Sequence, residues 1–180
     1  TVLCLDDPHV REILPEIKRR VITYGLQAPA DYRVEGISFT GASSRFAIYH
    51  RDTLLGTVRL NVPGLFNVYN AMAAIAVARE MELTFPVIRE GLQRFTGVHR
   101  RLDVRGKAGG ITVVDDYGHH PTEIRATLAA AKQVWPGRIL VVFQPHRYTR
   151  TQALFEEFLT AFKDADNLII TDIYPASEEP

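Results

Sequence analysis

Two polar stretches in the second half of the sequence carry the side chains best suited to chemistry. The first, DDYGHHPTE, covers residues 115–123, and the second, QPHRYTRT, covers residues 144–151. Each follows a short apolar run and leads into a helical pattern, and such loops gather at the carboxyl edge of a parallel sheet, where ligands bind. We therefore expect their aspartates, histidines, tyrosines and arginines to surround one cleft.

The histidines of these loops admit two interpretations. A neutral imidazole beside a charged substrate, such as that of His119, can accept or orient a proton. The alternative is that His119 and His120 are solvated rings in a helix-capping loop. Adjacent histidines without an HxxxH spacing argue against structural zinc. A metal enzyme using His119, His120 and His146 is therefore the least favoured alternative.

The charged residues of the two loops also leave alternatives open. Asp115 and Asp116 can complement a helix dipole, and Asp116 can instead hold a ribose hydroxyl. Arg147 and Arg150 lie three residues apart across an expected helix start, where they can cradle a carboxylate or a phosphate. The alternative for these arginines is surface pairing with Glu156 or Glu157.

Two further groups lie outside these loops. Asn67 and Asn70 open a helical pattern at spacing i, i+3, so both amides can face the edge of one adenine. The alternative is that Asn67 caps the helix and Asn70 is exposed. Arg100 and Arg101 lie between the two halves of the chain. They can hold a nucleotide phosphate or ribose, or form salt bridges between the halves.

The pattern of expected elements changes near residue 97 and predicts an α/β fold. The first half should contain an antiparallel meander, because runs such as RFAIY alternate with period two. In the second half, strands that alternate with helices predict a mostly parallel sheet with right-handed crossovers. For the first half we expect strands at 2–6 and 21–24, the meander over 32–62, and helices at 8–20, 67–82 and 86–94. For the second half we expect strands at 102–105, 111–114, 139–143 and 168–171, and helices at 121–134 and 149–163.

Composition excludes several classes of protein. The chain has 180 residues, 46% hydrophobic and 23% charged, which excludes a disordered chain or a coiled coil. The 21 basic and 21 acidic residues cancel, so we expect no nucleic-acid partner. No apolar run is long enough for membrane insertion, and the single cysteine, Cys4, cannot form an internal disulfide. The basic excess is concentrated in residues 94–150, which contain both loops.

Four strings in this order, GLFNVYNAMAAIAVA, FTGVHRRLD, DDYGHHPTEIRATL and QPHRYTRT, resemble the Mur ligase family. The resemblance extends over essentially the whole chain, including LCLDDPHVREILP and VITYG. It is strongest to the branch that joins L-alanine to UDP-N-acetylmuramate in peptidoglycan synthesis. It implies that residues 1–96 are the latter part of the central ATP-binding domain. Residues 97–180 would be most of the Rossmann-like C-terminal domain, which admits the amino acid.

The resemblance implies nucleotide-binding roles for five residues. Asn67 and Asn70 match the asparagines that contact adenine. Arg101, with Arg100 beside it, matches the hinge arginine that approaches the nucleotide. Asp116 matches the aspartate that binds the ribose.

The resemblance also implies a pocket for L-alanine and the muramoyl carboxylate, lined by Tyr117, His119, Arg147 and Arg150. Catalytic roles would fall to the last three of these. The two arginines would fix the alanine carboxylate, and His119 would orient or deprotonate the amine. Phe66 departs from the family pattern, because a histidine is common at that position.

The implied reaction is ATP-driven amide formation through an acyl phosphate, with ATP and Mg2+ as cofactors, in the cytoplasm. Its partners would be UDP-N-acetylmuramate, L-alanine and ATP. No GxxxxGK[ST] phosphate loop occurs in this sequence, so we expect the triphosphate and metal ligands to lie elsewhere in a longer parent protein. We also expect this segment alone to be inactive. The alternatives are a ligase that adds a peptide in muropeptide recycling and a non-catalytic module of the same fold.

Overall fold

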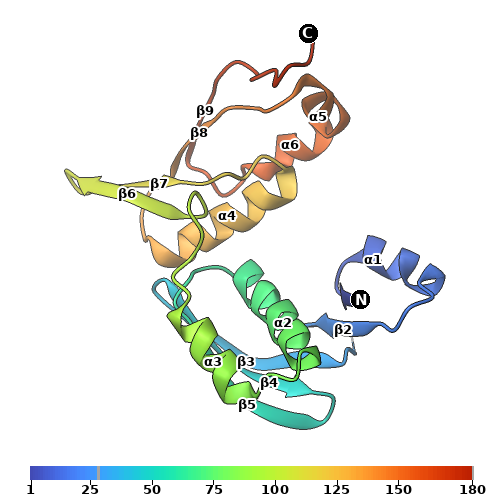
Figure 1. The fold of residues 1–180 in the computed structure, drawn as a ribbon. Coiled ribbons are helices and arrows are strands. Elements are labelled where there is room, and N and C mark those ends of the chain that lie inside the picture. Colours follow the sequence, from blue (N-terminus) through green and yellow to red (C-terminus); the bar gives the residue numbers. More distant parts are fainter. Residues whose placement is uncertain (28, 180) are drawn as a thin grey trace. The chain divides into compact units, whose positions relative to one another are not determined.

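A computed structural model describes residues 1–27 and 29–179 of the chain. The chain folds as two compact units, Thr1–Thr96 and Gly97–Pro180 (Figure 1). The division between the units falls where the sequence pattern changes. Each unit has its own cluster of buried apolar side chains, so the two cores are separate.

The first unit is built on a five-stranded sheet with strand order β1-β2-β3-β4-β5. Its members are β1 (Val2–Cys4), β2 (Ile22–Gly25), β3 (Tyr32–Thr40), β4 (Ser43–His50) and β5 (Thr53–Leu60). The first three strands are parallel, and β3, β4 and β5 are antiparallel. The meander predicted over residues 32–62 is therefore confirmed. Gly41 closes the first hairpin with φ 54°, a conformation that favours glycine.

Helices connect and cover these strands. They are α1 (Pro8–Ile13), the short 3-10 helix η1 (Leu14–Glu16), α2 (Leu65–Glu80) and α3 (Phe85–Arg94). Asp7 caps α1 by accepting the backbone N–H groups of His9 and Val10. The helix expected over residues 8–20 was predicted too long. It ends at Ile13 because Pro15 lacks an N–H and its ring would clash with a carbonyl one turn earlier.

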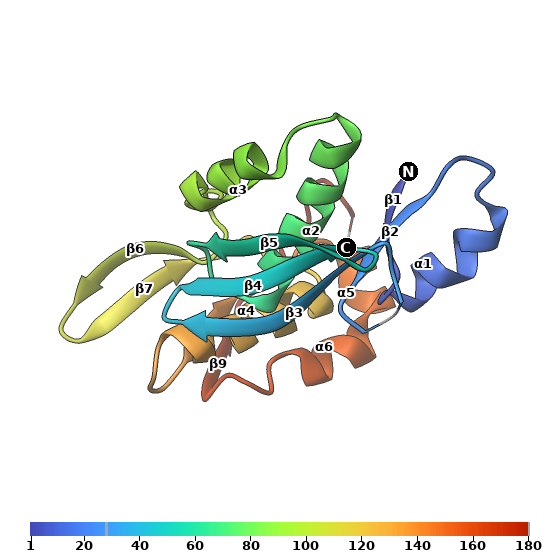
Figure 2. The same ribbon diagram turned by 90° about the horizontal axis from the view of Figure 1, so that it is seen from below.

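The core of the first unit lies between the sheet and α2 (Figure 2). Alternate residues of β4 and β5 point into it, because side chains of a strand alternate between its two faces. The α2 residues at helical spacing meet them from the other side. The largest of these side chains that are at most 1% exposed are Phe46, Ile48, Val58, Leu60, Val68, Met72 and Ile75.

The described residues of the second unit form two small sheets and three helices. The strands β6 (Asp103–Ala108) and β7 (Ile111–Asp115) form an antiparallel hairpin, and β8 (Leu140–Phe143) pairs with β9 (Asn167–Ile170) in parallel. The helices are α4 (Pro121–Val134), α5 (Tyr148–Ala153) and α6 (Phe155–Ala161). Ile124, Leu128, Phe143 and Ala161 form their common core.

Two expectations for the second unit were wrong in detail. Residues 111–114 and 139–143 were expected in one parallel sheet, but β7 pairs with β6 and β8 pairs with β9. The reason is a two-residue turn at Gly109 and Gly110, whose φ values of 57° and 78° fold β7 back along β6. The helix expected over 149–163 is divided at Leu154, whose φ of −114° departs from the helical range.

We expect Met72→Ala to lower the free energy of unfolding by about 2–5 kcal/mol, because it removes a fully buried side chain and leaves a cavity. The matched control is Met81→Ala at the end of the same helix, where the residue is 68% exposed and the loss should stay below about 0.5 kcal/mol. Urea unfolding followed by circular dichroism measures both. Equal losses would contradict this placement of the core.

Candidate functional site

The loop after β7 is anchored by the carboxylate of Asp116. Its Oδ1 accepts the backbone N–H of Gly118 at 2.7 Å and the hydroxyl of Thr127 at 3.2 Å. Its Oδ2 accepts the backbone N–H of Leu102 at 2.9 Å. A Cβ at position 118 would lie 2.8 Å from Asp116 Oδ1, so glycine permits the close approach. Asp116 thus ties the loop to α4 and to the segment that precedes β6.

A second carboxylate, that of Glu123, organises the histidine loop. Its Oε2 accepts the backbone N–H groups of His119 at 3.0 Å and His120 at 3.1 Å. The His120 ring accepts the backbone N–H of Thr122, which completes a capping box at the start of α4. For His120, the helix-capping interpretation is therefore correct. Burial raises the pKa of Glu123, but these backbone hydrogen bonds and the charges of His119 and Arg101 outweigh it and leave the pKa below its usual range.

The arginines at residues 100 and 101 gather around Tyr117. The Arg100 guanidinium lies 5.0 Å from the centre of the tyrosine ring, and that of Arg101 lies 6.0 Å away. Arg100 Nε pairs with Asp115 at 3.2 Å, and Arg101 pairs with Glu123 at 3.4 Å. Both acids belong to the second unit, so these pairs form within it.

The geometry of His119 assigns its tautomer. Its Nδ1 lies 3.0 Å from the backbone carbonyl oxygen of Tyr117. Because that oxygen only accepts hydrogen bonds, Nδ1 carries the proton in a neutral ring and Nε2 is the basic nitrogen. The His119 side chain is 31% exposed, and its ring centre lies 6.0 Å from that of His146. The structure thus brings the two predicted loops together at these histidines.

In the second loop, Arg150 folds back on His146. Its Nη1 donates to the backbone oxygen of His146 at 3.2 Å and lies 3.3 Å from that residue's Nδ1. Because arginine only donates, Nδ1 of His146 is the acceptor and Nε2 carries the proton. The His146 ring also stacks on Tyr174, with the ring centres 5.6 Å apart. These contacts fix the direction of the Arg150 side chain.

Beside this pair, a carboxylate from the end of the chain lies at the start of α5. Glu178 accepts the hydroxyl of Thr149 at 2.6 Å and its backbone N–H at 3.1 Å, and these hydrogen bonds lower the pKa of Glu178. Arg147 Nη1 lies 4.0 Å from the same carboxylate. Neither Arg147 nor Arg150 pairs with Glu156 or Glu157 among the described residues.

Sequence reasoning missed the contributions of Tyr174 and Glu178. Both residues contact the second loop but lie more than 20 residues after it in the chain, so no local motif marks them. The bias toward acidic residues in the last stretch of the sequence was the available signal.

The two asparagines lie in the first unit, at the start of α2. Asn67 Nδ2 donates to the backbone oxygen of Pro63 at 2.7 Å, and Asn70 Nδ2 lies 3.3 Å from Asn67 Oδ1. The N-cap position is Gly64, so the alternative interpretation of Asn67 as the helix cap is wrong. Asn70 is exposed, and its Oδ1 accepts no hydrogen bond from the described part of the chain.

Two kinds of feature are absent from the described residues. Within residues 1–27 and 29–179, no three His, Cys, Asp or Glu side chains meet as metal ligands. In the same residues, no helix is both long enough and apolar enough to cross a membrane.

Comparison with protein families decides the relationship. Residues 1–78 match the Mur ligase middle domain, and residues 100–180 match the domain described as Mur ligase, glutamate ligase domain. The chain belongs to the Mur ligase family. The resemblance found in the sequence is thereby confirmed, and the two matched Mur ligase domains together cover most of the chain.

Individual Mur ligases give a closer comparison. UDP-N-acetylmuramate–L-alanine ligase of Syntrophus aciditrophicus is 64% identical over 99% of this chain, which spans 37% of that protein. The crystal structure of UDP-N-acetylmuramate-alanine ligase from Thermotoga maritima matches with TM-score 0.73 and 33% identity, over 85% of this chain and 34% of that one.

A more distant Mur ligase shows the fold. The MurF ligase of Thermotoga maritima, solved in complex with ADP, matches with TM-score 0.73 at 22% identity, over 99% of this chain and 40% of its own. The predicted α/β fold class is confirmed by these structures, although the described strands of the second unit form one antiparallel and one parallel pair. The chain spans well under half the length of the Mur ligases that it matches.

We expect Glu123→Gln to destabilise the second unit by about 1 kcal/mol at pH 7, because it weakens the capping box and the pair with Arg101. Folding lowers the pKa of Glu123, so its carboxylate stabilises the fold above its unfolded-state pKa and loses that effect as the pH falls through the folded-state pKa. The difference from wild type should therefore shrink below about pH 4.5.

The control is Glu156→Gln, an exposed residue at the start of α6 for which no hydrogen bond or ion pair is found among the described residues. Urea unfolding at several pH values between about 3.5 and about 7 measures the free energy of unfolding of both variants. A Glu123→Gln effect that stays constant across this range would show that the charge of the carboxylate is not responsible.

Proposed function

We propose that the parent protein is a UDP-N-acetylmuramate–L-alanine ligase. In this proposal, residues 1–96 are the latter part of its central ATP-binding domain. Residues 97–180 are most of its C-terminal, amino-acid-binding domain. The observation that carries the proposal is a carboxylate bound at Thr149 and Arg147. It lies beside the loop of His146, whose ring centre is 6.0 Å from that of His119. The 64% identity to a ligase of that name supports it.

The second unit supplies groups suited to an amino-acid substrate. Arg147 and Arg150 present two guanidinium forks, which match a carboxylate in geometry and charge. In the structure, the position beside Arg147 holds the Glu178 carboxylate. The carboxylate of L-alanine would therefore either displace the Glu178 carboxylate or bind the arginines together with it. We propose that both arginines hold the alanine carboxylate.

His119 supplies the base. Its Nε2 is the unprotonated nitrogen of the neutral ring, because Nδ1 donates to the Tyr117 carbonyl. We propose that Nε2 accepts a proton from the ammonium group of L-alanine, which leaves the amine free to attack an activated carbonyl. The Tyr117 ring lies at right angles to the imidazole, with the ring centres 5.3 Å apart, and we propose that it lines the substrate site. ATP supplies the phosphoryl group that activates the muramoyl carboxylate when it is bound.

The residues proposed to bind the nucleotide differ in how many of their polar atoms remain available for a ligand. Asn70 is exposed and retains amide atoms that can read the edge of adenine, whereas both ends of the Asn67 amide are already engaged. Asp116 accepts three internal hydrogen bonds, so a ribose hydroxyl would add to an occupied carboxylate. Arg100 and Arg101 are held by acids of their own unit.

We propose ATP and Mg2+ as cofactors of the parent protein, with UDP-N-acetylmuramate and L-alanine as its other substrates. The ADP complex of a related MurF supports the use of ATP. No three potential metal ligands meet in the described residues, so we assign magnesium no ligand among them. We also propose that the reaction requires parts of the parent beyond these 180 residues and takes place in the cytoplasm.

In the full-length parent, we expect Arg150→Ala to raise KM for L-alanine by about 10²-fold, because it removes a charge-assisted contact to the substrate carboxylate. KM for ATP should change little. Steady-state assays of phosphate release with L-alanine varied measure this effect.

The matched control is Arg138→Ala, an exposed arginine for which no hydrogen bond or ion pair is found in the described residues. It should leave both KM values within about twofold of wild type. A wild-type parent that accepts a tripeptide in preference to L-alanine would contradict the proposed acceptor. An unchanged KM in Arg150→Ala would contradict the role of this arginine.

A further inference from the structure

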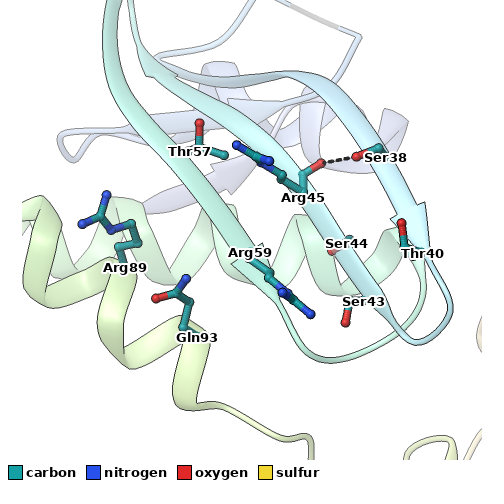
Figure 3. Close-up of a pocket in the computed structure, with 9 residues that line it drawn as sticks. All are labelled: Ser38, Thr40, Ser43, Ser44, Arg45, Thr57, Arg59, Arg89 and Gln93. Carbon is teal, nitrogen blue, oxygen red and sulfur yellow. Dashed lines mark hydrogen bonds between the residues drawn. The ribbon is translucent and has the colours of Figure 1, made fainter.

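A polar hollow of about 680 Å³ lies on the first unit, and none of the residues assigned above lines it (Figure 3). Serine and threonine hydroxyls of β3, β4 and β5 line it together with Arg45 and Arg59 of the sheet. The helix α3 adds Arg89 and Gln93. The lining contains no carboxylate, no aliphatic side chain and no aromatic ring. Its volume falls within the range of about 300–1,000 Å³ that is typical of small-molecule sites.

Strand register places most of the polar lining on one face of the meander. Ser38 lies opposite Arg45, which in turn lies opposite Arg59. Residues paired in this way project from the same face of a sheet. The neighbours Phe46 and Val58 project from the opposite face, into the apolar core. The hollow therefore lies on the side of the meander that faces away from that core.

Charge in this hollow is uncompensated. Arg45 and Arg59 are direct cross-strand partners, and like charges in that position destabilise a sheet. Neither of them, nor Arg89, forms an ion pair with a carboxylate in the described part of the chain. On the neighbouring strand, by contrast, Arg33 pairs with Glu35. Within the described part of the first unit, three exposed guanidinium groups thus surround one concavity whose lining supplies no carboxylate.

We propose that this hollow binds a small phosphate-bearing ligand, of the class of pyrophosphates and sugar phosphates. Guanidinium forks bind phosphate oxygens in pairs, and the surrounding hydroxyls and the Gln93 amide can donate further hydrogen bonds. A nucleobase has no aromatic or apolar surface to stack on here. The site is distinct from the proposed nucleotide and amino-acid groups, because none of those residues lines it.

The bound anion relieves the repulsion between Arg45 and Arg59. Binding therefore raises the melting temperature of the first unit, and the effect weakens as salt screens the charges. Removal of either arginine relieves the same repulsion without a ligand. The single variants Arg45→Gln and Arg59→Gln should accordingly have melting temperatures equal to or slightly above that of wild type when no anion is present.

Isothermal titration of the 180-residue chain with inorganic pyrophosphate at low ionic strength tests the proposal. We expect saturable binding at one site, weakened by about tenfold or more in Arg45→Gln/Arg59→Gln and to a similar extent in Arg89→Gln. The matched control is Arg94→Gln, which lies on the same helix as Arg89 but pairs with Glu90 outside the hollow. It should bind within about twofold of wild type.

Circular dichroism melts without ligand show that each variant is folded. No heat of binding to wild type would overturn the proposal. An equal loss in Arg94→Gln and Arg45→Gln/Arg59→Gln would also overturn it, because attraction to net surface charge would then explain the binding. Tighter binding of a glutamate-rich peptide than of pyrophosphate at the same arginines would assign the surface to a protein partner instead.

Discussion

The carboxylate of Glu123 is the constraint on which the arrangement of the second unit depends. It accepts two successive backbone N–H groups, those of His119 and His120, and pairs with Arg101. One side chain thereby sets the start of α4, the path of the histidine loop and the direction of the arginine. Because the backbone is held there, the His119 ring meets the Tyr117 carbonyl and keeps its basic nitrogen at Nε2. The proposed base is therefore positioned by a helix cap.

The arginines of the two units differ in whether a carboxylate lies beside them. In the second unit, Arg100, Arg101 and Arg147 each have a carboxylate beside them, so an anionic substrate there must exchange with or join an existing pair. In the first unit, Arg45 and Arg59 face each other without such a partner among the described residues. Exchange at a paired arginine favours selectivity, since only an anion of matching geometry displaces the internal one, whereas an unpaired cluster retains charge for a ligand.

Local patterns predicted the elements whose causes are local. The meander followed from period-two alternation, and α4 was predicted at its observed bounds because Pro121 and Glu123 mark its start. The hairpin of β6 and β7 was missed because the glycine pair at 109 and 110 was not interpreted as a tight turn. The role of the Glu178 carboxylate could not be predicted from local patterns, because its partner Thr149 lies 29 residues earlier in the chain. For the candidate site, sequence identified the residue types and the structure added their internal partners.

We propose that the loops holding His119 and Arg150 form the acceptor pocket of an L-alanine-adding ligase. A crystal structure of the full-length parent protein with L-alanine bound tests it most directly. We expect the substrate carboxylate within hydrogen-bond distance of the Arg147 and Arg150 guanidinium groups, with the substrate amine facing His119 Nε2. L-alanine bound elsewhere, with Arg147 still beside Glu178 and Arg150 still on His146, would contradict it.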